Sequence, residues 1–443
     1  MNSISIIKEI EENYDINSIV SNELPIWQYI RNLIYSQANP SKKTSTKIKS
    51  FYTLIQNHNW GNSSASENYK YLLFTDSREE ILYNNKIVDK TSQNLIEILK
   101  DDLLVVINPS GQKHLLNSNY DFNHMSSSFF HYNRWVSGIK KSCFIENSKE
   151  LDQIFKKNNI ILDVDYFNRL FFTYTEKFSE WLMKIAPKAV FINCYYSLFH
   201  QALIYACKKQ GIKTIEIQHG LISDSHNQYS PEKFIGKHTM PDYLLCYNEY
   251  VKTLTNQNYM LSKNITPIGH YYLEQTLNNE KYNSIKPRFN SYDKVVAVST
   301  QNDLEQELIK FIEEIALIKP DYLFIIKTRD NKRINSRFEN IKIDSEVDMY
   351  SLINQADLHI SCYSTVALEA SMIGTPTILI NINNMSKLYY NSIVQIFKNI
   401  KICDSNNEVL SLMENWSPNN TTEKPYVLNN KKRIKQFLDN YIK

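Results

Sequence analysis

A histidine follows the second of two predicted strands that are joined by a single helix. Residues 188–220 read KAVFINCYYSLFHQALIYACKKQGIKTIEIQHG, in which apolar runs at 189–193 and 213–217 flank a helical pattern. Two strands joined by one helix are most simply parallel, with a right-handed crossover. His219 then lies at the carboxyl end of a parallel strand, where open α/β sheets place their ligands. An imidazole there can take a proton from a substrate, and the alternative is a histidine that only caps the strand.

A second segment whose residues could bind a ligand is DLHISCYSTVALEASMIGTPTILI, residues 357–380. An apolar strand runs into Tyr363, and a helix begins directly after it. Ser364 and Thr365 are therefore predicted at a helix N-terminus, whose unpaired N–H groups suit a phosphate. Glu369, about one turn further on, could accept hydrogen bonds from ribose hydroxyls, as an acidic residue does in dinucleotide-binding folds. An ordinary helix cap beside a surface glutamate is the alternative.

Charged residues end two further predicted strands. Residues 68–75 (NYKYLLFT) lead into Asp76 and Glu79, two carboxylates that rival His219 as bases. Residues 322–326 (YLFII) lead into Lys327 and Arg329, whose positive charges could neutralise a leaving phosphate.

The composition limits the class of protein. A chain of 443 residues with 42% hydrophobic and 22% charged residues is an ordinary globular protein of roughly two or three domains. A net charge of +3 gives no field that argues for nucleic acid as a partner. The six cysteines are scattered without a C-x-x-C pair, which argues against a zinc site or a disulfide framework. There is no signal-peptide core and no run of about 18 apolar residues, so we expect a cytoplasmic protein.

Alternating patterns divide the chain into four parts. Residues 1–67 are predicted as a helical N-terminal extension, because apolar residues recur there at helical spacing. Strand and helix patterns alternate through 68–276, break at a polar linker over 277–293, and restart through 294–443. The sequence thus predicts an α/β protein with two doubly wound domains. Basic residues around Lys42 and at 431–433 suggest a peripheral contact with the inner face of an anionic membrane, and solvent-facing segments are the alternative.

Together these motifs resemble the GT-B glycosyltransferases of bacterial surface polysaccharide synthesis. Ser-Thr, Glu369 and Gly-Thr-Pro within 364–376 resemble the carboxyl domain of that fold. Gln-His-Gly at 218–220 is similar to a turn in the Kdo-transferase-like capsule and lipopolysaccharide enzymes, and to the Trp-His-Gly of CDP-glycerol glycerophosphotransferases. The likeness covers roughly residues 68–400. It implies two Rossmann-like domains facing each other across a cleft, with the acceptor on residues 68–276 and the donor nucleotide on 294–443.

The resemblance also implies roles for the donor-binding residues. Ser364 and Thr365, beside Tyr363, would bind the donor phosphate, and Glu369 would bind the ribose. Where relatives have Lys-Pro-His-Pro, this chain has Lys-Thr-Arg-Asp at 327–330, so the acid role of that family histidine is absent or is taken over by the charge of Arg329.

For catalysis, the resemblance implies that His219 is a general base or orients a phosphate, with Asp76 and Glu79 as rivals. No metal or cofactor is expected, because helix N-termini and basic side chains neutralise the diphosphate in that family. The Asp-x-Asp pair at 163–165, a pattern typical of metal-dependent transferases, precedes a helix and has no strand before it.

The predicted activity is transfer of a sugar from a nucleotide-sugar donor to a glycan or lipid-linked acceptor in capsule or O-antigen synthesis. Three alternatives remain open at this point. They are a CDP-polyol phosphotransferase of the teichoic-acid type, a sugar-nucleotide epimerase of the same fold, and a non-catalytic nucleotide-sugar binding subunit.

Overall fold

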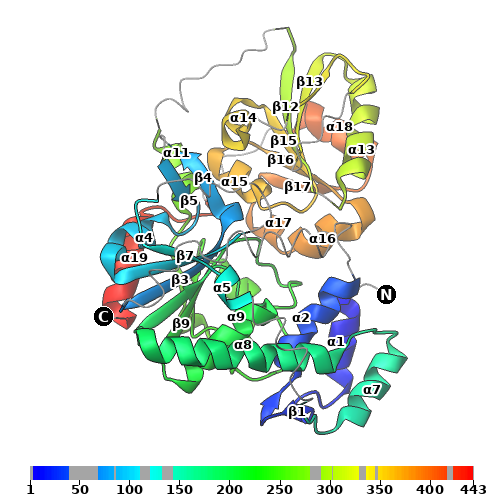
Figure 1. Ribbon diagram of the computed structural model, residues 1–443. Coiled ribbons are helices and arrows are strands. Elements are labelled where there is room, and N and C mark those ends of the chain that lie inside the picture. The colour runs from blue at the N-terminus through cyan, green and yellow to red at the C-terminus, as the bar shows by residue number, and fades with distance from the viewer. Residues whose placement is uncertain are drawn as a thin grey trace. The chain divides into compact units, whose positions relative to one another are not determined.

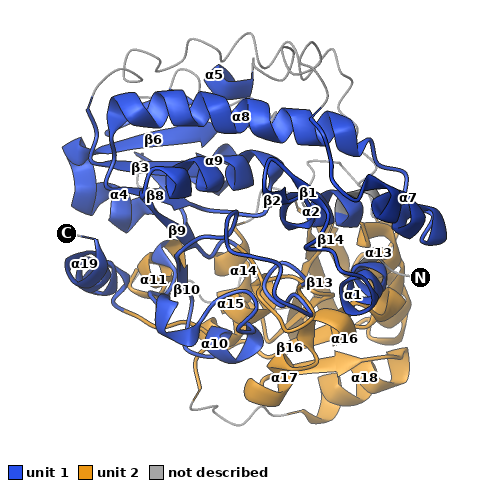
Figure 2. Ribbon diagram, turned by 90° about the horizontal axis from the view of Figure 1, so that it is seen from below, with its two compact units in different colours: residues 1–219, 227–271, 429–443 blue, residues 220–226, 272–428 orange. Residues whose placement is uncertain are grey.

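The computed structural model describes residues 3–38, 68–83, 86–109, 120–131, 143–279, 291–301, 303–328, 336–344, 348–416 and 423–442. The chain forms two compact units (Figures 1 and 2). Unit 1 comprises Met1–His219, Asn227–Tyr271 and Asn429–Lys443, and unit 2 comprises Gly220–His226 and Tyr272–Leu428. The basic residues around Lys42 and most of the predicted linker, residues 280–290, lie outside the described residues.

Unit 1 is built on a seven-stranded sheet with the order β11-β10-β9-β8-β3-β6-β7. Every neighbouring pair in it is parallel. Its central strands are almost wholly buried, which agrees with their continuous apolar sequences, because parallel sheets are covered on both faces. The strands are β3 (Tyr71–Asp76), β6 (Leu103–Asn108), β7 (His124–Ser126), β8 (Ala189–Ile192), β9 (Lys213–Ile217), β10 (Tyr243–Cys246) and β11 (Ile265–Pro267).

Alternate residues of β3 point to opposite faces of this sheet and meet different helices. Leu73 lies in a buried cluster with residues of α4 (Gln93–Leu99) and of the last helix, α19 (Asn430–Tyr441). Phe74 faces the other side, where Trp181 of α8 (Val164–Ile185) and Phe199 of α9 (Leu198–Lys209) pack against it at centroid distances of 6.3 Å each. Other elements of this unit are β4 (Glu80–Tyr83), β5 (Lys86–Asp89), α5 (Ser128–His131), α7 (Ser148–Lys157) and α10 (Val251–Leu254), and α11 (Tyr271–Leu277) has only its first residue in this unit and otherwise belongs to unit 2.

Residues 3–38, which lie within the range 1–67 predicted as a helical extension, contain two helices and belong to unit 1. They form α1 (Ser3–Asn13), the short antiparallel pair β1 (Val20–Ser21) and β2 (Leu24–Pro25), and α2 (Trp27–Ala38). A buried ion pair joins these helices, with Arg31 Nη2 2.6 Å from Glu11 Oε1. Arg31 also donates to the carbonyl of Asn227 at 2.8 Å, and Glu11 accepts from the amide of Glu232 at 2.9 Å. The extension is thus fixed to the loop that follows the Gln-His-Gly turn.

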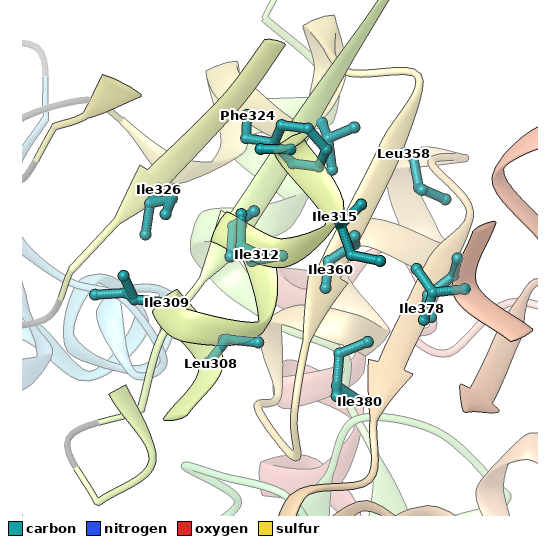
Figure 3. Packing of buried hydrophobic residues seen from close by; sticks show 14 of the residues in the cluster. Leu308, Ile309, Ile312, Ile315, Phe324, Ile326, Leu358, Ile360, Ile378 and Ile380 are labelled. Carbon is teal, nitrogen blue, oxygen red and sulfur yellow. The ribbon is translucent and has the colours of Figure 1, made fainter. Parts of the chain in front are cut away.

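Unit 2 repeats the plan with six parallel strands in the order β14-β13-β12-β15-β16-β17. Figure 3 shows α13 (Glu305–Ile318) on one face of the sheet, with Ile312 and Ile315 packed among Phe324, Ile360 and Ile378. On the opposite face, Leu352 and Ala370, from α14 (Met349–Gln355) and α15 (Val366–Ile373), pack against the sheet. The other elements are β12 (Lys294–Ser299), β13 (Tyr322–Lys327), β14 (Ile341–Ile343), β15 (Leu358–Ser361), β16 (Thr377–Ile380), α16 (Met385–Tyr390), α17 (Ile393–Ile396), β17 (Ile400–Cys403) and α18 (Asn406–Asn415). Two doubly wound α/β units are therefore present, as predicted.

The last helix does not stay with the unit that precedes it in sequence. Phe437 and Leu438 of α19 are buried in the core of unit 1. Asn430, at the start of the helix, accepts a hydrogen bond from Asn94 at 2.8 Å and donates to the carbonyl of Ile268 at 3.0 Å. The structure groups Asn429–Lys443 with unit 1. The predicted second domain, 294–443, had included these residues.

Candidate functional site

The first candidate site lies at the carboxyl ends of β3, β8 and β9 in unit 1. In chain order, β3, β6 and β7 extend the sheet toward one side, and β8 then pairs with the other side of β3. Such a reversal is a topological switch point, the place where open α/β sheets bind ligands. β3 ends in Asp76, and β9 is followed by His219, whose pKa responds to the charge of Asp76. The structure therefore brings these two predicted residues to one edge of the sheet.

His219 is half-buried, and one of its two ring nitrogens lies within hydrogen-bonding distance of a neighbour. Its Nε2 lies 3.4 Å from the hydroxyl of Tyr196. Its Nδ1 makes no hydrogen bond of good geometry, although the backbone of Asn193 is close enough to raise its pKa. Burial, and next the positive charge of Arg78, outweigh that contact and lower the pKa of His219 to about 4. The imidazole is consequently neutral near pH 7 and can accept a proton.

Asp76 is occupied by its neighbours. One oxygen accepts from the amide of Arg78 at 2.9 Å and from its Nε at 2.8 Å, and the other accepts from Nη2 of Arg78 at 3.1 Å and from Nδ2 of Asn108 at 2.9 Å. Burial acts to raise the pKa of Asp76, but these bonds and the charge of Arg78 prevail and lower it. With its acceptor positions filled, Asp76 is placed to orient Arg78 rather than to take a proton from a ligand.

Arg78 was not among the predicted site residues. Its side chain is 68% exposed although its guanidinium is fixed by Asp76, so a charged group is presented at the strand ends in a set orientation. A guanidinium group held in this way is suited to binding anions. Its signal in the sequence is its place between Asp76 and Glu79, directly after a strand.

Glu79 lies in the short 3₁₀ turn η2 (Ser77–Glu79) that follows β3. Burial raises the pKa of Glu79 to about 7, with the charge of Lys90 opposing the shift. A carboxyl group with a pKa near neutrality can act as acid or base. The charges of Lys90, Asp89, Asp76 and Arg78 act on Glu79, and the last two also act on His219.

A second histidine that the sequence did not single out lies in the first turn of α9. Nδ1 of His200 is 2.6 Å from the carbonyl of Cys194, and its backbone amide donates to the N-cap hydroxyl of Ser197 at 3.1 Å. Burial lowers the pKa of His200 to about 4, and the charge of Asp76 acts on it in the opposite direction. His200 is thus a neutral ring beneath the same edge of the sheet.

A buried hydrogen-bond network fixes the end of β8 that carries these groups. Asn193 donates to the hydroxyl of Thr75 at 2.8 Å and accepts from Ser92 at 3.1 Å. Asp89 in turn accepts from Thr75 at 2.7 Å and from the amide of Ser92 at 2.7 Å. Because every contact is satisfied and buried, the network holds β3, β5, β8 and the start of α4 in one arrangement.

The second candidate site is the switch point of the sheet in unit 2. β12, β13 and β14 run to one side, and β15 then pairs with the other side of β12. Tyr363, Ser364 and Thr365 follow β15 at this point, and Gln301, which follows β12, accepts from the amide of Tyr363 at 3.3 Å. The hydroxyl of Tyr390 donates to the carbonyl of Ser364. The predicted donor-binding segment is therefore gathered beside the first strand of its own sheet.

The hydroxyls of this segment are better placed for a ligand than most of the backbone amides. The amides of Ala367 and Leu368 already donate to the carbonyls of Ser364 and Thr365, at 3.1 and 2.9 Å. Ser364 Oγ accepts from the amide of Val366 at 3.3 Å and retains its own proton to donate. Among the residues that the structure describes, none hydrogen-bonds to the hydroxyl of Thr365.

The other predicted donor-binding residues lie around this segment. Glu369 is half-buried in the first turn of α15. Lys327 ends β13, two strands from β15, and burial lowers the pKa of its amine while Asp344 and Asp348 oppose the shift. Arg329 lies outside the described residues.

The described ranges contain no group of three or more His, Cys, Asp or Glu side chains that could hold a metal ion. Among the helices they include, none has the length and hydropathy to cross a bilayer.

Comparison with known proteins identifies the fold and no closer relationship. No protein-family model matches the chain, and no curated protein matches it. Solved structures do match, among them UDP-GlcNAc 2-epimerase from Methanocaldococcus jannaschii in complex with UDP-GlcNAc and UDP, at 15% identity and a TM-score of 0.52 over 83% of this chain and 99% of that one. The Neisseria meningitidis UDP-GlcNAc 2-epimerase bound to UDP-GlcNAc matches at 15% identity and 0.52, over 84% and 100%. A co-structure of Staphylococcus aureus MnaA with UDP matches at 10% and 0.53, over 84% and 96%. At such identities the likeness shows the fold alone, which is the predicted GT-B fold with two Rossmann-like domains.

Proposed function

We propose that this chain is a metal-independent GT-B glycosyltransferase that moves a sugar from a nucleotide-sugar donor to a hydroxyl of a glycan or lipid-linked acceptor. One observation carries the proposal. Each of the two motifs predicted to do chemistry lies at the switch point of its own parallel sheet, His219 beside β8 and Ser364 beside β12. Those are the two places where this type of fold binds ligands.

The donor half of the proposal rests on unit 2. Ser364 and Thr365 would donate their hydroxyls to the diphosphate, Lys327 and Arg329 would supply positive charge, and Glu369 would bind the ribose. UDP is the first nucleotide to test, because two of the matching structures are described as complexes with UDP. The acceptor is expected from capsule or O-antigen synthesis, where peripheral contact with the inner membrane would bring a lipid-linked acceptor within reach.

The acceptor half rests on unit 1. A neutral imidazole at His219 would remove the proton of the acceptor hydroxyl as its oxygen attacks the anomeric carbon. Glu79, with a pKa near neutrality, is the alternative base. Asp76 is the weakest of the three candidates, because hydrogen bonds from Arg78 and Asn108 fill its acceptor positions.

Nucleotide binding tests the donor half directly. UDP, CDP, GDP and CMP are titrated into the protein calorimetrically, without added metal and then with Mg²⁺. We expect one of them to bind, and the Thr365→Val variant to bind it about tenfold more weakly, as the loss of one hydrogen bond to a charged group predicts. Ser411→Ala, at an exposed position on α18, is the matched control and should bind like the wild type. If no nucleotide binds, the proposal fails.

An epimerase is the second candidate, because the three matching structures reported above include two described as UDP-GlcNAc 2-epimerases. The two activities differ in their need for an acceptor. An epimerase converts UDP-GlcNAc alone to its C2 epimer, and in D₂O the exchange at C2 is visible by proton NMR. A transferase leaves the donor intact or hydrolyses it slowly until an acceptor is added, and then releases nucleotide in step with product.

A further inference from the structure

A pocket lies at the edge of the unit 1 sheet that is opposite to His219. Its volume is about 570 Å³, within the usual range for sites that bind small molecules. Its wall includes Lys213 and Tyr243, the first residues of β9 and β10, and Asn264, which comes directly before β11. These strands are parallel, so their amino ends share one edge. The length of β9 alone puts roughly 15 Å between this edge and the one that carries His219.

Positive charge dominates the polar part of this pocket. Of the described residues that line it, Lys208, Lys213 and Lys237 are basic and Asp242 is the one carboxylate. Asp242 is occupied, because one oxygen accepts from Lys208 at 2.6 Å and the other accepts from the amide and the hydroxyl of Thr214, at 2.9 and 2.8 Å. The wall therefore carries more ammonium groups than its carboxylate can neutralise.

Lys208 and Lys213 keep N–H groups for a ligand. An ammonium group has three donors. Nζ of Lys208 donates to Asp242, and Nζ of Lys213 donates to the carbonyl of Tyr441 at 2.5 Å. Among the described residues, neither amine has a second hydrogen-bond acceptor. Each therefore retains two donors for the oxygen atoms of a bound anion.

Lys237 contributes charge more than hydrogen bonds. Its Nζ already donates to the carbonyls of Asn258, at 2.6 Å, and of Tyr259. Burial, and next the charge of Lys208, lower the pKa of Lys237 to about 8, so that the amine is still mostly protonated at pH 7. Because like charges repel each other, an anion bound near both lysines relieves a cost that the protein otherwise carries.

The rest of the wall is largely apolar. Ile212 and Met260 are buried, whereas Leu261 is 48% exposed. Tyr243 and Tyr259 also line the pocket. An inorganic ion would leave this apolar surface in water, whereas a ligand with an apolar body would cover it.

We propose that this pocket is a second ligand site, which binds a small organic anion, a phosphate or carboxylate joined to an apolar or aromatic group. The oxygen atoms of the anion accept from Lys208 and Lys213, Lys237 adds its charge, and the apolar body packs on Met260 and Leu261. The residues involved are separate from those of the proposed transfer reaction. The proposal therefore stands whether or not that reaction occurs.

The test follows the methyl signal of Met260 by NMR on the full chain labelled with ¹³C-methyl methionine. This signal is the one that is lost in Met260→Leu. Naphthyl phosphate, naphthoate, inorganic phosphate and naphthol are titrated separately to millimolar concentration. We expect naphthyl phosphate or naphthoate to move the signal saturably, and the one that binds more tightly identifies the anionic group. Inorganic phosphate and naphthol should bind at least about tenfold more weakly, because the first lacks the apolar body and the second lacks the charge.

Charge reversal at an exposed lysine shows whether the ligand contacts the amines of the pocket. Lys213→Glu should weaken binding of the preferred anion at least about tenfold, because it replaces a donor with a negative charge. Lys209→Glu is the matched control, since it makes the same change in net charge at the end of α9. The amine of Lys209 lies 5.6 Å from the ring centroid of Tyr205, and Lys209 does not line the pocket. This variant should bind the anion like the wild type.

The proposal is overturned if neither naphthyl phosphate nor naphthoate moves the Met260 signal of the wild type, a result that needs no charge variant. It is also overturned if naphthol binds as tightly as the two anions. Equal weakening by Lys209→Glu and Lys213→Glu would overturn it as well, because binding would then follow net charge and not the lysines of the pocket.

Discussion

Burial sets the charge of individual residues in unit 1. His219 and His200 are neutral because desolvation disfavours their imidazolium forms. The same effect raises the pKa of Glu216 to about 8, although two tyrosine hydroxyls and the amide of Tyr195 bond to its carboxyl group. A carboxyl group at the centre of a tyrosine cluster is therefore largely protonated near pH 7.

Glu216 predicts a pH dependence of stability. Its pKa is raised on folding, so the folded protein binds a proton that the unfolded chain has released between about pH 4.5 and 8, and the free energy of unfolding falls as pH rises through that window. Glu216→Gln keeps the shape of the side chain but has no carboxyl proton to gain or lose. Relative to the wild type it should gain at most about 1.4 kcal/mol per pH unit from pH 5 to 8, measured by urea unfolding. A constant difference at every pH would mean that Glu216 is already ionised when folded.

Sequence reasoning located residues whose importance follows from position in a strand pattern. His219 and Ser364 come directly after apolar runs, and the structure confirms that both runs are parallel strands. Tyr196 and His200 are harder to find from the sequence, because they lie in the turn before α9 and in its first turn and do not directly follow a strand. Nor does the sequence show that hydrogen bonds already fill the acceptor positions of Asp76, because one of these bonds comes from Asn108 on the neighbouring strand.

At the scale of elements, the N-terminal helices are integral to unit 1. Arg31 is 1% exposed and bonds to Glu11, while Trp27 donates to the same carboxylate at 2.9 Å. The backbone around residues 227–232, beyond the Gln-His-Gly turn, takes part in the same network. The apolar spacing of residues 3–38 predicted the helices, but it contained no sign of this anchoring.

We expect Arg31→Met to destabilise unit 1 by about 3–5 kcal/mol, because it leaves Glu11 charged and buried without its partner. The double variant Arg31→Met, Glu11→Leu should recover much of that loss, since no lone charge remains buried. Lys8→Met breaks an exposed pair of the same extension, Lys8 with Glu232, and should cost about 1 kcal/mol or less. Chemical denaturation measures all three, and equal effects at Arg31 and Lys8 would contradict the role given to the buried pair.

At the scale of the whole molecule, neither unit is a continuous stretch of sequence. Unit 1 takes its last helix from the end of the chain, and unit 2 includes Gly220–His226, directly after His219. Alternation of strands and helices predicted the two sheets, because buried parallel strands are nearly continuous apolar runs. It could not predict where α19 packs, because an amphipathic helix shows which face is buried and not against which sheet.

A paired core substitution tests this division. Phe437→Ala in α19 should cost about 3–5 kcal/mol and raise amide exchange in β6, α4 and β9 of unit 1. Met413→Ala in α18 is the matched change, and it should raise exchange around α13 and β12 of unit 2. Hydrogen-exchange mass spectrometry separates the two patterns. Increased exchange in unit 2 after Phe437→Ala would show that α19 belongs to the core of the unit it follows in sequence.

The return of α19 to the first sheet bears on how the polypeptide is made. Synthesis completes all strands of unit 1 before those of unit 2, yet Ile434, Phe437 and Leu438 emerge from the ribosome after every strand of both sheets. Unit 1, whose strands are synthesised first, is consequently complete only after the last helix has been made. Until those residues arrive, the nascent chain carries one sheet face without its final cover, the kind of surface that chaperones recognise.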